Sequence, residues 1–271
     1  MPSGAHIGIA VGVAALGIGV AVQQKTTAFR SPRQTAALAE GHFPYEGNSI
    51  QIRDFPPPPL PGSVAMQRDE EARTAALHFR GTPRYALAAL DSVRTHPETV
   101  NAFSCALGTN IDEKDTPHLY RLMTGVRLAA RSSAYLLKSR YKRARPFVAF
   151  HEKSCSAADS ELQGSGSYPS AGSAVGWAYA LVLADINLAR REPIMKRGFE
   201  YGQSRIICDA EWQSDVDAGR AVADEIIDRM RGKEQFQSDM DAARGEVGNA
   251  IRSNRAPSRN CASESKVLAT N

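Results

Sequence analysis

The sequence has only four cysteines, Cys105, Cys155, Cys208 and Cys261, and no two of them form a C-x-x-C pair. This absence argues against a zinc knuckle and against a thioredoxin-like redox motif. In an oxidising compartment the cysteines are instead available for disulfide bonds. The predicted bond joins Cys155 to Cys208, because both flank the motif-bearing part of the chain; two buried free thiols are the alternative.

The chain also lacks a concentrated block of charge. Its 33 Lys and Arg residues and 29 Asp and Glu residues are interleaved, and the formal net charge is only +4. Nucleic-acid-binding domains usually carry a concentrated basic face. The scattered pattern therefore predicts an ordinary solvated surface and no nucleic-acid partner.

One apolar run stands at residues 7–22, and no Lys or Arg precedes it. The run is short for a membrane-spanning helix and suits the h-region of a secretory signal, with Gly19, Val20 and Ala21 as a small-residue cleavage site. The missing basic n-region argues the other way. Residues 1–22 are predicted to be a signal peptide of a periplasmic or secreted protein; an uncleaved membrane anchor, or a start codon elsewhere, is the alternative.

A proline-rich stretch, F-P-P-P-P-L-P-G, occupies residues 55–62. Such a stretch cannot form a helix or a central strand and is expected as extended polyproline II. It follows a polar, aperiodic segment, residues 23–54, which indicates a linker. We predict that residues 55–62 form a stiff strap on the domain surface; an SH3-type ligand is the alternative.

Strand-like alternation is almost absent from residue 63 onward. Apolar residues instead recur at three- and four-residue spacing, in segments rich in the good helix formers Ala, Leu, Arg and Glu. Helices are predicted at residues 66–79, 85–93, 117–142, 173–188, 194–208, 215–230 and 235–251. Residues 252–271 are rich in Ser, Asn and Arg and are predicted to be disordered. The fold class is therefore all-α, with a single helical-bundle domain over residues 63–251.

Three segments would place anion-binding groups at helix ends, and the first is K-S-R-Y-K-R-A-R-P at residues 138–146. Lys138 and Arg145 are two helical turns apart, so a helix would carry both on one face. Pro146 then stops the helix. Basic residues at a helix C-terminus are common, so this segment alone is a weak signal.

The second segment, G-S-G-S-Y-P-S-A-G-S at residues 164–173, leads directly into a predicted helix. Unpaired backbone N–H groups at a helix start can hold a phosphate, and Ser170 can cap the helix or donate a hydrogen bond. A capped helix without any ligand is the alternative.

The third segment is S-R-I-I-C-D-A-E-W-Q-S-D at residues 204–215. Glu211 and Asp215 are four residues apart and would share a face on a continuous helix. Charged residues at this spacing are usually solvated. The neighbouring Trp212, Ile206 and Ile207 indicate that this segment is at least partly buried.

In this order the three segments resemble the signature K-x6-R-P, P-S-G-H and S-R-x5-H-x3-D. Class A acid phosphatases share it with lipid phosphate phosphatases and vanadium haloperoxidases of the PAP2 superfamily. The resemblance to the class A bacterial acid phosphatases extends over roughly residues 50–250. It includes the strap, V-N-A-F-S at 100–104, E-K-D at 113–115, G-S-Y-P-S at 166–170, G-W-A at 176–178, Y-G-Q-S-R at 201–205 and W-Q-S-D-V-D at 212–217.

The resemblance implies a helical bundle of the PAP2 type, with no metal and no other cofactor. It assigns phosphate binding to Lys138, Arg145 and Arg205, and Ser170 with its neighbouring backbone would complete the cradle. Asp215 would orient the family's nucleophile. The expected ligand is phosphate or another small anion, and a homodimer is compatible with the family.

Neither histidine of the signature is present. The position of the family's nucleophile, four residues before Asp215, holds Glu211, and the position of its proton donor holds Gly172. The preceding glycine of the motif is replaced by Ala171. The family reaction passes through a phosphohistidine and needs an acid for the leaving oxygen. An ionised Glu211 would instead attract the pocket's own cations.

The sequence therefore predicts a pseudophosphatase with a phosphate pocket and lost or greatly reduced phosphomonoesterase activity. One alternative is a repurposed enzyme that uses Glu211 and Asp215 as acid and base. Another is a residual acid phosphatase that works through Glu211 or through His151 as a relocated acid, although His151 is interpreted first as an ordinary surface or loop histidine. Asp209 is expected to add negative charge near the site.

Overall fold

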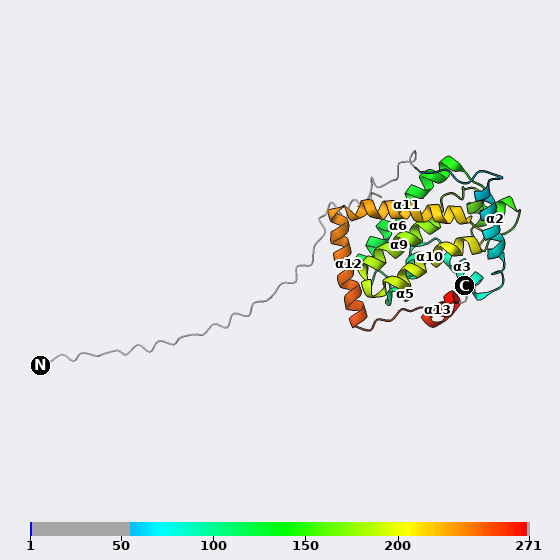
Figure 1. Cartoon of the computed structure of the whole chain (residues 1–271). Helices are drawn as coiled ribbons and strands as arrows, with labels where there is room; N and C mark the ends of the chain where they lie inside the picture. Colours follow the sequence, from blue (N-terminus) through cyan, green and yellow to red (C-terminus); the bar gives the residue numbers. More distant parts are fainter. Residues whose placement is uncertain (2–54, 270–271) are drawn as a thin grey trace.

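The computed structural model describes residues 55–269 together with Met1. The predictions for residues 1–22 and 23–54 lie outside this part of the chain. Residues 55–269 form helices and no strands, which confirms the all-α prediction (Figure 1). In the same residues no helix is both long and apolar enough to cross a membrane.

All seven predicted helices are present, and their ends differ from the prediction by at most three residues. They are α2 (Val64–Leu77), α3 (Pro83–Asp91), α6 (Pro117–Tyr141), α9 (Ala171–Ile186), α10 (Arg191–Ile207), α11 (Gln213–Arg231) and α12 (Glu234–Arg252). The shorter elements were not predicted: α4 (His96–Asn101), α5 (Ser104–Leu107), α7 (Pro146–Ala149), α8 (Asp159–Gln163), the 3-10 turn η2 (Leu188–Arg190) and α13 (Cys261–Ala269).

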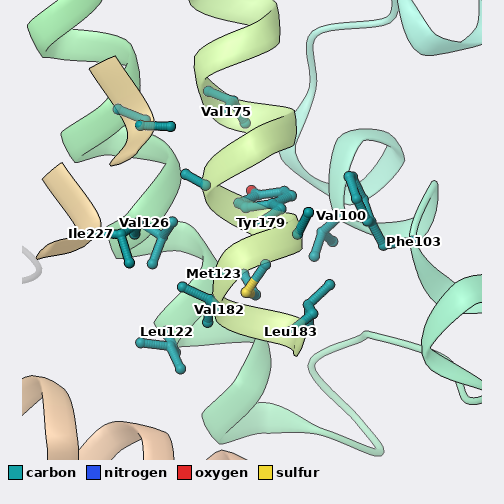
Figure 2. Close-up of a cluster of buried hydrophobic side chains, with 14 of the residues drawn as sticks. Val100, Phe103, Leu122, Met123, Val126, Val175, Tyr179, Val182, Leu183 and Ile227 are labelled. Carbon is teal, nitrogen blue, oxygen red and sulfur yellow. The ribbon is translucent and has the colours of Figure 1, made fainter. Parts of the chain in front are cut away.

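Helix α9 lies at the centre of the bundle because its sequence, A-G-S-A-V-G-W-A-Y-A-L-V-L-A-D-I, is apolar on almost every face. A helix without a polar stripe is buried by its neighbours. Helices α6, α10 and α11 pack around it, with α12 across one end of the bundle (Figure 1). In Figure 2, Tyr179 and Leu183 of α9 lie among Met123 of α6 and Val100 and Phe103.

Glycines allow α9 and α10 to approach each other closely. A Cβ atom at Gly198 would lie 2.3 Å from the Cβ of Ala180, and one at Gly176 would lie 2.4 Å from a ring carbon of Tyr201. No carbon atoms fit at such distances, so any larger residue would push the helices apart. Since the short turn η2 joins the two helices, they run antiparallel, and the end of α10 lies beside the start of α9.

Phe55 and Pro56, the first residues of the strap at residues 55–62, pack on the domain, as predicted for the strap. The Tyr141 hydroxyl donates to the Phe55 carbonyl oxygen at 2.9 Å, and the Tyr168 hydroxyl donates to that of Pro56 at 2.8 Å. The rings of Phe55 and Tyr168 are also in contact, with centroids 6.2 Å apart.

Two disulfide bonds join distant parts of the chain. The predicted bond between Cys155 and Cys208 is confirmed, and a second, unpredicted bond joins Cys105 to Cys261. The second bond corrects the prediction of a disordered tail over residues 252–271, because it attaches α13 to the domain. The tail also inserts Glu264, whose carboxylate lies 3.4 Å from Nε of Arg197. A covalent bond and an ion pair thus attach a helix in which no residue is fully buried.

Arg197 of α10 is one of the largest fully buried side chains, and it is paired with Asp91 at the end of α3. Its Nη1 and Nη2 atoms donate to the two Asp91 oxygens at 3.1 and 2.5 Å, and Nε donates to the Ala102 carbonyl oxygen at 3.1 Å. Asp91 also accepts a hydrogen bond of 2.6 Å from Ser204. Helices α3, α10 and α13 therefore meet at this buried ion pair.

Replacing Arg197 with Met should lower the free energy of unfolding by about 3–5 kcal/mol, because the buried Asp91 carboxylate loses its partner. The measurement is urea unfolding followed by circular dichroism. Arg191→Met is the matched control on the same helix: its side chain is 53% exposed and its pair with Asp185 should contribute less than about 1 kcal/mol. Equal, small losses in both variants would contradict this role for the buried pair.

Candidate active site

The four residues assigned to phosphate by resemblance lie at helix ends that meet in one place. Lys138 is in the last turn of α6, Arg145 precedes α7, Ser170 caps α9 and Arg205 is in the last turn of α10. All four are buried. Because α10 runs antiparallel to α9, Arg205 comes to lie beside Ser170, and the structure brings these side chains together around Glu211.

The Glu211 carboxylate is held from both sides. Its Oε1 atom lies 3.5 Å from Nζ of Lys138 and 3.2 Å from Nη1 of Arg145. Its Oε2 atom accepts a hydrogen bond from the Ser170 hydroxyl and lies 3.4 Å from Nε of Arg205. Glu211 itself is only 3% exposed. Three cations and one hydroxyl therefore surround a carboxylate rather than an empty space.

The charges of this cluster follow from burial and proximity. Burial disfavours the ionised form of Glu211, but Lys138, Arg205, Arg145 and the Ser170 hydroxyl outweigh it and lower the pKa of the carboxyl to about 2. Burial lowers the pKa of Lys138 to about 8, although Glu211 opposes this shift. At neutral pH both groups are therefore charged.

Backbone carbonyl groups hold two of the cations in place. Lys138 donates from Nζ to the Gly166 and Ser167 carbonyl oxygens, at 2.9 and 2.5 Å. Arg145 donates to the carbonyl oxygens of Leu162, Ala210 and Gly166, at 2.8, 2.9 and 3.0 Å. The glycine-rich loop thus turns carbonyl oxygens toward the cations, whereas the sequence suggested N–H groups turned toward an anion.

Ser170 both caps its helix and bonds to the site. Its hydroxyl oxygen accepts a hydrogen bond of 2.9 Å from the Ser173 N–H, and the hydroxyl proton is donated to Glu211. Ser170 therefore caps α9 and donates a hydrogen bond to Glu211 at the same time. The start of α9 faces the Glu211 carboxylate, an arrangement that the positive end of a helix favours.

The local geometry that joins Lys138 to Arg145 differs from the prediction. Helix α6 ends at Tyr141, and Lys142 adopts a left-handed conformation with φ of 47° that takes the chain out of the helix. Arg145 is extended, with φ of −74° and ψ of 154°, as expected before Pro146. The two cations therefore do not share a helix face; the non-helical segment between them brings both to the Glu211 carboxylate.

Glu211 and Asp215 do not share a helix face either, because α11 begins only at Gln213. The fully buried Asp215 accepts hydrogen bonds of 2.7 Å from Arg143 Nη1 and of 2.7 Å from the Trp212 N–H. Burial raises the pKa of Asp215 to about 6, although Arg143 opposes this. The carboxylate of Asp215 therefore caps the start of α11 by accepting the Trp212 N–H.

Arg143 was not predicted as part of this site. Its guanidinium joins Asp215 to Asp69 of α2, with 2.7 Å to each carboxylate, and also donates to Ser214 at 2.8 Å. The basic run at residues 138–145 was the signal, but that run alone could not indicate which of its cations faces which carboxylate.

One expectation and one alternative about nearby residues do not agree with the structure, whereas the favoured interpretation of His151 as an ordinary surface histidine does. Asp209 accepts two hydrogen bonds from Arg73 of α2, at 2.7 and 2.8 Å, so Arg73 compensates its negative charge. His151 is exposed and lies outside the residues that line the cavity in front of Glu211. The expectation that Asp209 adds charge to the site is therefore wrong, and the position of His151 does not suit a relocated acid.

The cavity in front of Glu211 has a volume of about 50 Å³ and includes Gly172 in its wall. A Cβ atom at Gly172 would lie 3.0 Å from Cδ and 3.1 Å from Nε of Arg205. Arg205 thus occupies the space that a larger residue at 172 would need. From there it reaches Glu211 and also donates to the Ser92 hydroxyl at 2.8 Å, a partner that the sequence did not indicate.

The low pKa of Glu211 predicts a specific pH dependence. Its folded pKa lies below the ordinary value of 4.5, so its stabilising contribution is present above about pH 4.5 and is lost as the pH falls toward 2. The difference in unfolding free energy between the unaltered protein and Glu211→Gln should shrink by about 2 kcal/mol from about pH 6 to about pH 3. Urea unfolding across this range measures it.

Glu192→Gln, at an exposed glutamate of α10, is the matched control and should leave the pH dependence unchanged. A difference between Glu211→Gln and the unaltered protein that does not change with pH would contradict a carboxylate held in its ionised form.

Comparison of the sequence with known proteins identifies the family of this chain. The PAP2 superfamily profile matches residues 120–223. The non-specific acid phosphatase of Providencia stuartii is 40% identical over 198 residues, which cover 71% of this chain and 78% of that protein. The non-specific acid phosphatase of Salmonella typhimurium is 35% identical over 210 residues, covering 77% and 84%.

The acid phosphatase of Zymomonas mobilis is 33% identical over 214 residues, which cover 79% of this chain and 81% of that protein. The profile match includes Lys138, Arg145, Ser170, Arg205 and Glu211. The chain therefore belongs to the PAP2 superfamily and, within it, to the bacterial non-specific acid phosphatases.

Proposed function

We propose that this protein is an acid phosphatase homologue whose phosphate pocket is closed by its own carboxylate, so that phosphomonoesterase activity is lost or greatly reduced. The observation that carries the proposal is the position of Glu211 among Lys138, Arg145, Arg205 and Ser170. By resemblance these are the groups that would hold phosphate oxygens, and each of them is already bonded to the Glu211 side chain.

Electrostatics supports this closure. A phosphate dianion entering the cluster would meet the ionised Glu211 at short range. At about 4 Å and an effective dielectric constant near 20, each pair of unit charges interacts by roughly 4 kcal/mol, so the repulsion is substantial. The same carboxylate meanwhile takes up donors that phosphate would need. Glu211 thus acts as an internal substitute for the substrate's anion.

Chemistry supports a low activity as well. Carboxylates can attack phosphorus in other enzymes, but both oxygens of Glu211 are engaged by cations or by Ser170. Gly172, at the position that resemblance assigns to the proton donor, has no side chain that could protonate a leaving oxygen. General acid catalysis typically contributes about 10²- to 10⁴-fold to the rate.

The geometry does not favour an acid–base pair of Glu211 and Asp215. Such a pair needs both carboxyl groups to face one substrate, whereas Asp215 is fully buried and bonds to Arg143 and to the Trp212 N–H. A residual acid phosphatase remains the competing proposal, since the relatives named above are acid phosphatases.

We also propose export to the periplasm or the exterior. The two disulfide bonds support this location, because such bonds persist in oxidising compartments.

Turnover of p-nitrophenyl phosphate between about pH 5 and pH 7 tests the main proposal. The unaltered protein should show none above background. Gly172→His combined with Glu211→His should raise the rate by about 10²-fold or more, because the variant supplies an acid and frees Arg205 from Glu211. Gly172→His alone should stay inactive, since Glu211 still occupies the cluster and still repels a phosphate dianion.

Lys138→Met in the double-histidine background is the control and should abolish any restored turnover. Clear turnover by the unaltered protein that disappears in Glu211→Gln would refute the proposal in favour of a carboxylate nucleophile. An inactive but folded double-histidine variant would show that the rest of the pocket no longer supports the reaction.

A further inference from the structure

Three basic side chains of α6 line the same cavity. Arg127, Arg131 and Lys138 are separated by four and seven residues, which places them on one face of the helix. At about 1.5 Å per residue, Arg131 lies about 10 Å and Arg127 about 16 Å along the axis from Lys138. Lys138 is buried beside Glu211, whereas both arginines are partly exposed, so they belong to the outer part of the cavity.

The cavity as a whole has an excess of cations. Its lining includes six of them, Arg94, Arg127, Arg131, Lys138, Arg145 and Arg205, but only two carboxylates, Asp91 and Glu211. Asp91 is committed to Arg197. Glu211 is committed to the three inner cations. The outer cations therefore receive no charge compensation from the carboxylates of the cavity.

Arg127 and Arg131 have only neutral partners within residues 55–269. Arg127 donates from Nη2 to the Arg94 carbonyl oxygen at 2.6 Å, and Arg131 donates from Nη2 to the Tyr135 hydroxyl at 3.2 Å. The Arg131 guanidinium also lies over the Tyr135 ring, 4.8 Å from its centroid. Arg94 differs, because it pairs with Glu161 of α8.

These contacts orient the two guanidinium groups without neutralising them. Each group has five N–H donors, of which one makes a hydrogen bond named above. Like charges four residues apart on a helix repel each other, so the pair destabilises α6 unless an anion lies between them. Guanidinium groups bind oxyanions through two parallel hydrogen bonds, which suits the tetrahedral oxygens of phosphate.

We infer that Arg127 and Arg131 form an outer anion site that binds a phosphate group, either inorganic phosphate or the phosphate of a monoester. The inference goes beyond the proposed function, because Arg131 and Arg127 lie about two helical turns or more from Lys138 along α6 and do not need the inner cluster to be open. Val93 and Val175 also line the cavity and offer apolar surface to an ester group.

Isothermal titration calorimetry of the full chain with inorganic phosphate at neutral pH tests the inference. The unaltered protein should bind phosphate, and Arg127→Gln combined with Arg131→Gln should weaken the affinity by about tenfold or more. Arg121→Gln is the matched control: it removes the same charge from an exposed position of α6 outside the cavity lining and should change the affinity less than twofold.

A parallel titration with phenyl phosphate distinguishes the two sources of the ligand. Tighter binding than inorganic phosphate assigns the site to a monoester that uses the apolar wall, and equal binding assigns it to free phosphate. If the double variant is unfolded by circular dichroism, Arg131→Gln alone should still weaken binding severalfold.

Three outcomes would overturn the outer anion site: no phosphate binding by the unaltered protein, unchanged affinity in the arginine variants, or an equal loss in Arg121→Gln. None of them bears on whether Glu211 closes the inner cluster. Glu211→Gln tests that question separately. This variant should bind a second phosphate in the inner cluster, while binding at the outer anion site should still depend on Arg127 and Arg131.

Discussion

The contact of the buried Glu211 carboxylate with three buried cations is the interaction on which the rest of the site depends. Isolated charges are costly inside a protein, so Lys138, Arg145 and Arg205 can remain buried together only with a counter-charge or with many carbonyl oxygens. The structure supplies both. The carboxylate thereby joins the ends of α6, α9 and α10 to the chain before α11, and the glycines between α9 and α10 allow those ends to meet.

This arrangement divides the cavity into two parts with different electrostatic character. The inner part contains cations that already have an anionic partner, whereas the guanidinium groups of Arg127 and Arg131 in the outer part have none among residues 55–269. Gly172 contributes to this division, because the missing side chain leaves room for Arg205 to turn toward Glu211. Glu211 and Gly172 therefore complement each other physically: the carboxylate attracts Arg205, and the glycine leaves space for it.

Most of the fold could be predicted from the sequence because the apolar residues of the long helices recur at helical spacing. The tail could not, because α13 is held by the Cys105–Cys261 bond and by Glu264 on Arg197, and neither contact leaves a local pattern. The same limit explains Asp209. Its charge looked available next to Glu211 in the sequence, but a salt bridge to Arg73, 136 residues away in the chain, compensates it.

Residue identity, spacing and resemblance were enough to predict the helical class, the cation and serine positions of the motif, and the presence of Glu211 and Gly172. Which charges meet follows instead from the packing of the helices. The non-helical segment after α6, and not a shared helix face, brings Arg145 to the carboxylate, and Asp215 bonds to Arg143 instead of Glu211. Hydrogen bonds and ion pairs depend on distances of a few ångströms between segments far apart in the chain, and those distances arise only when the helices pack.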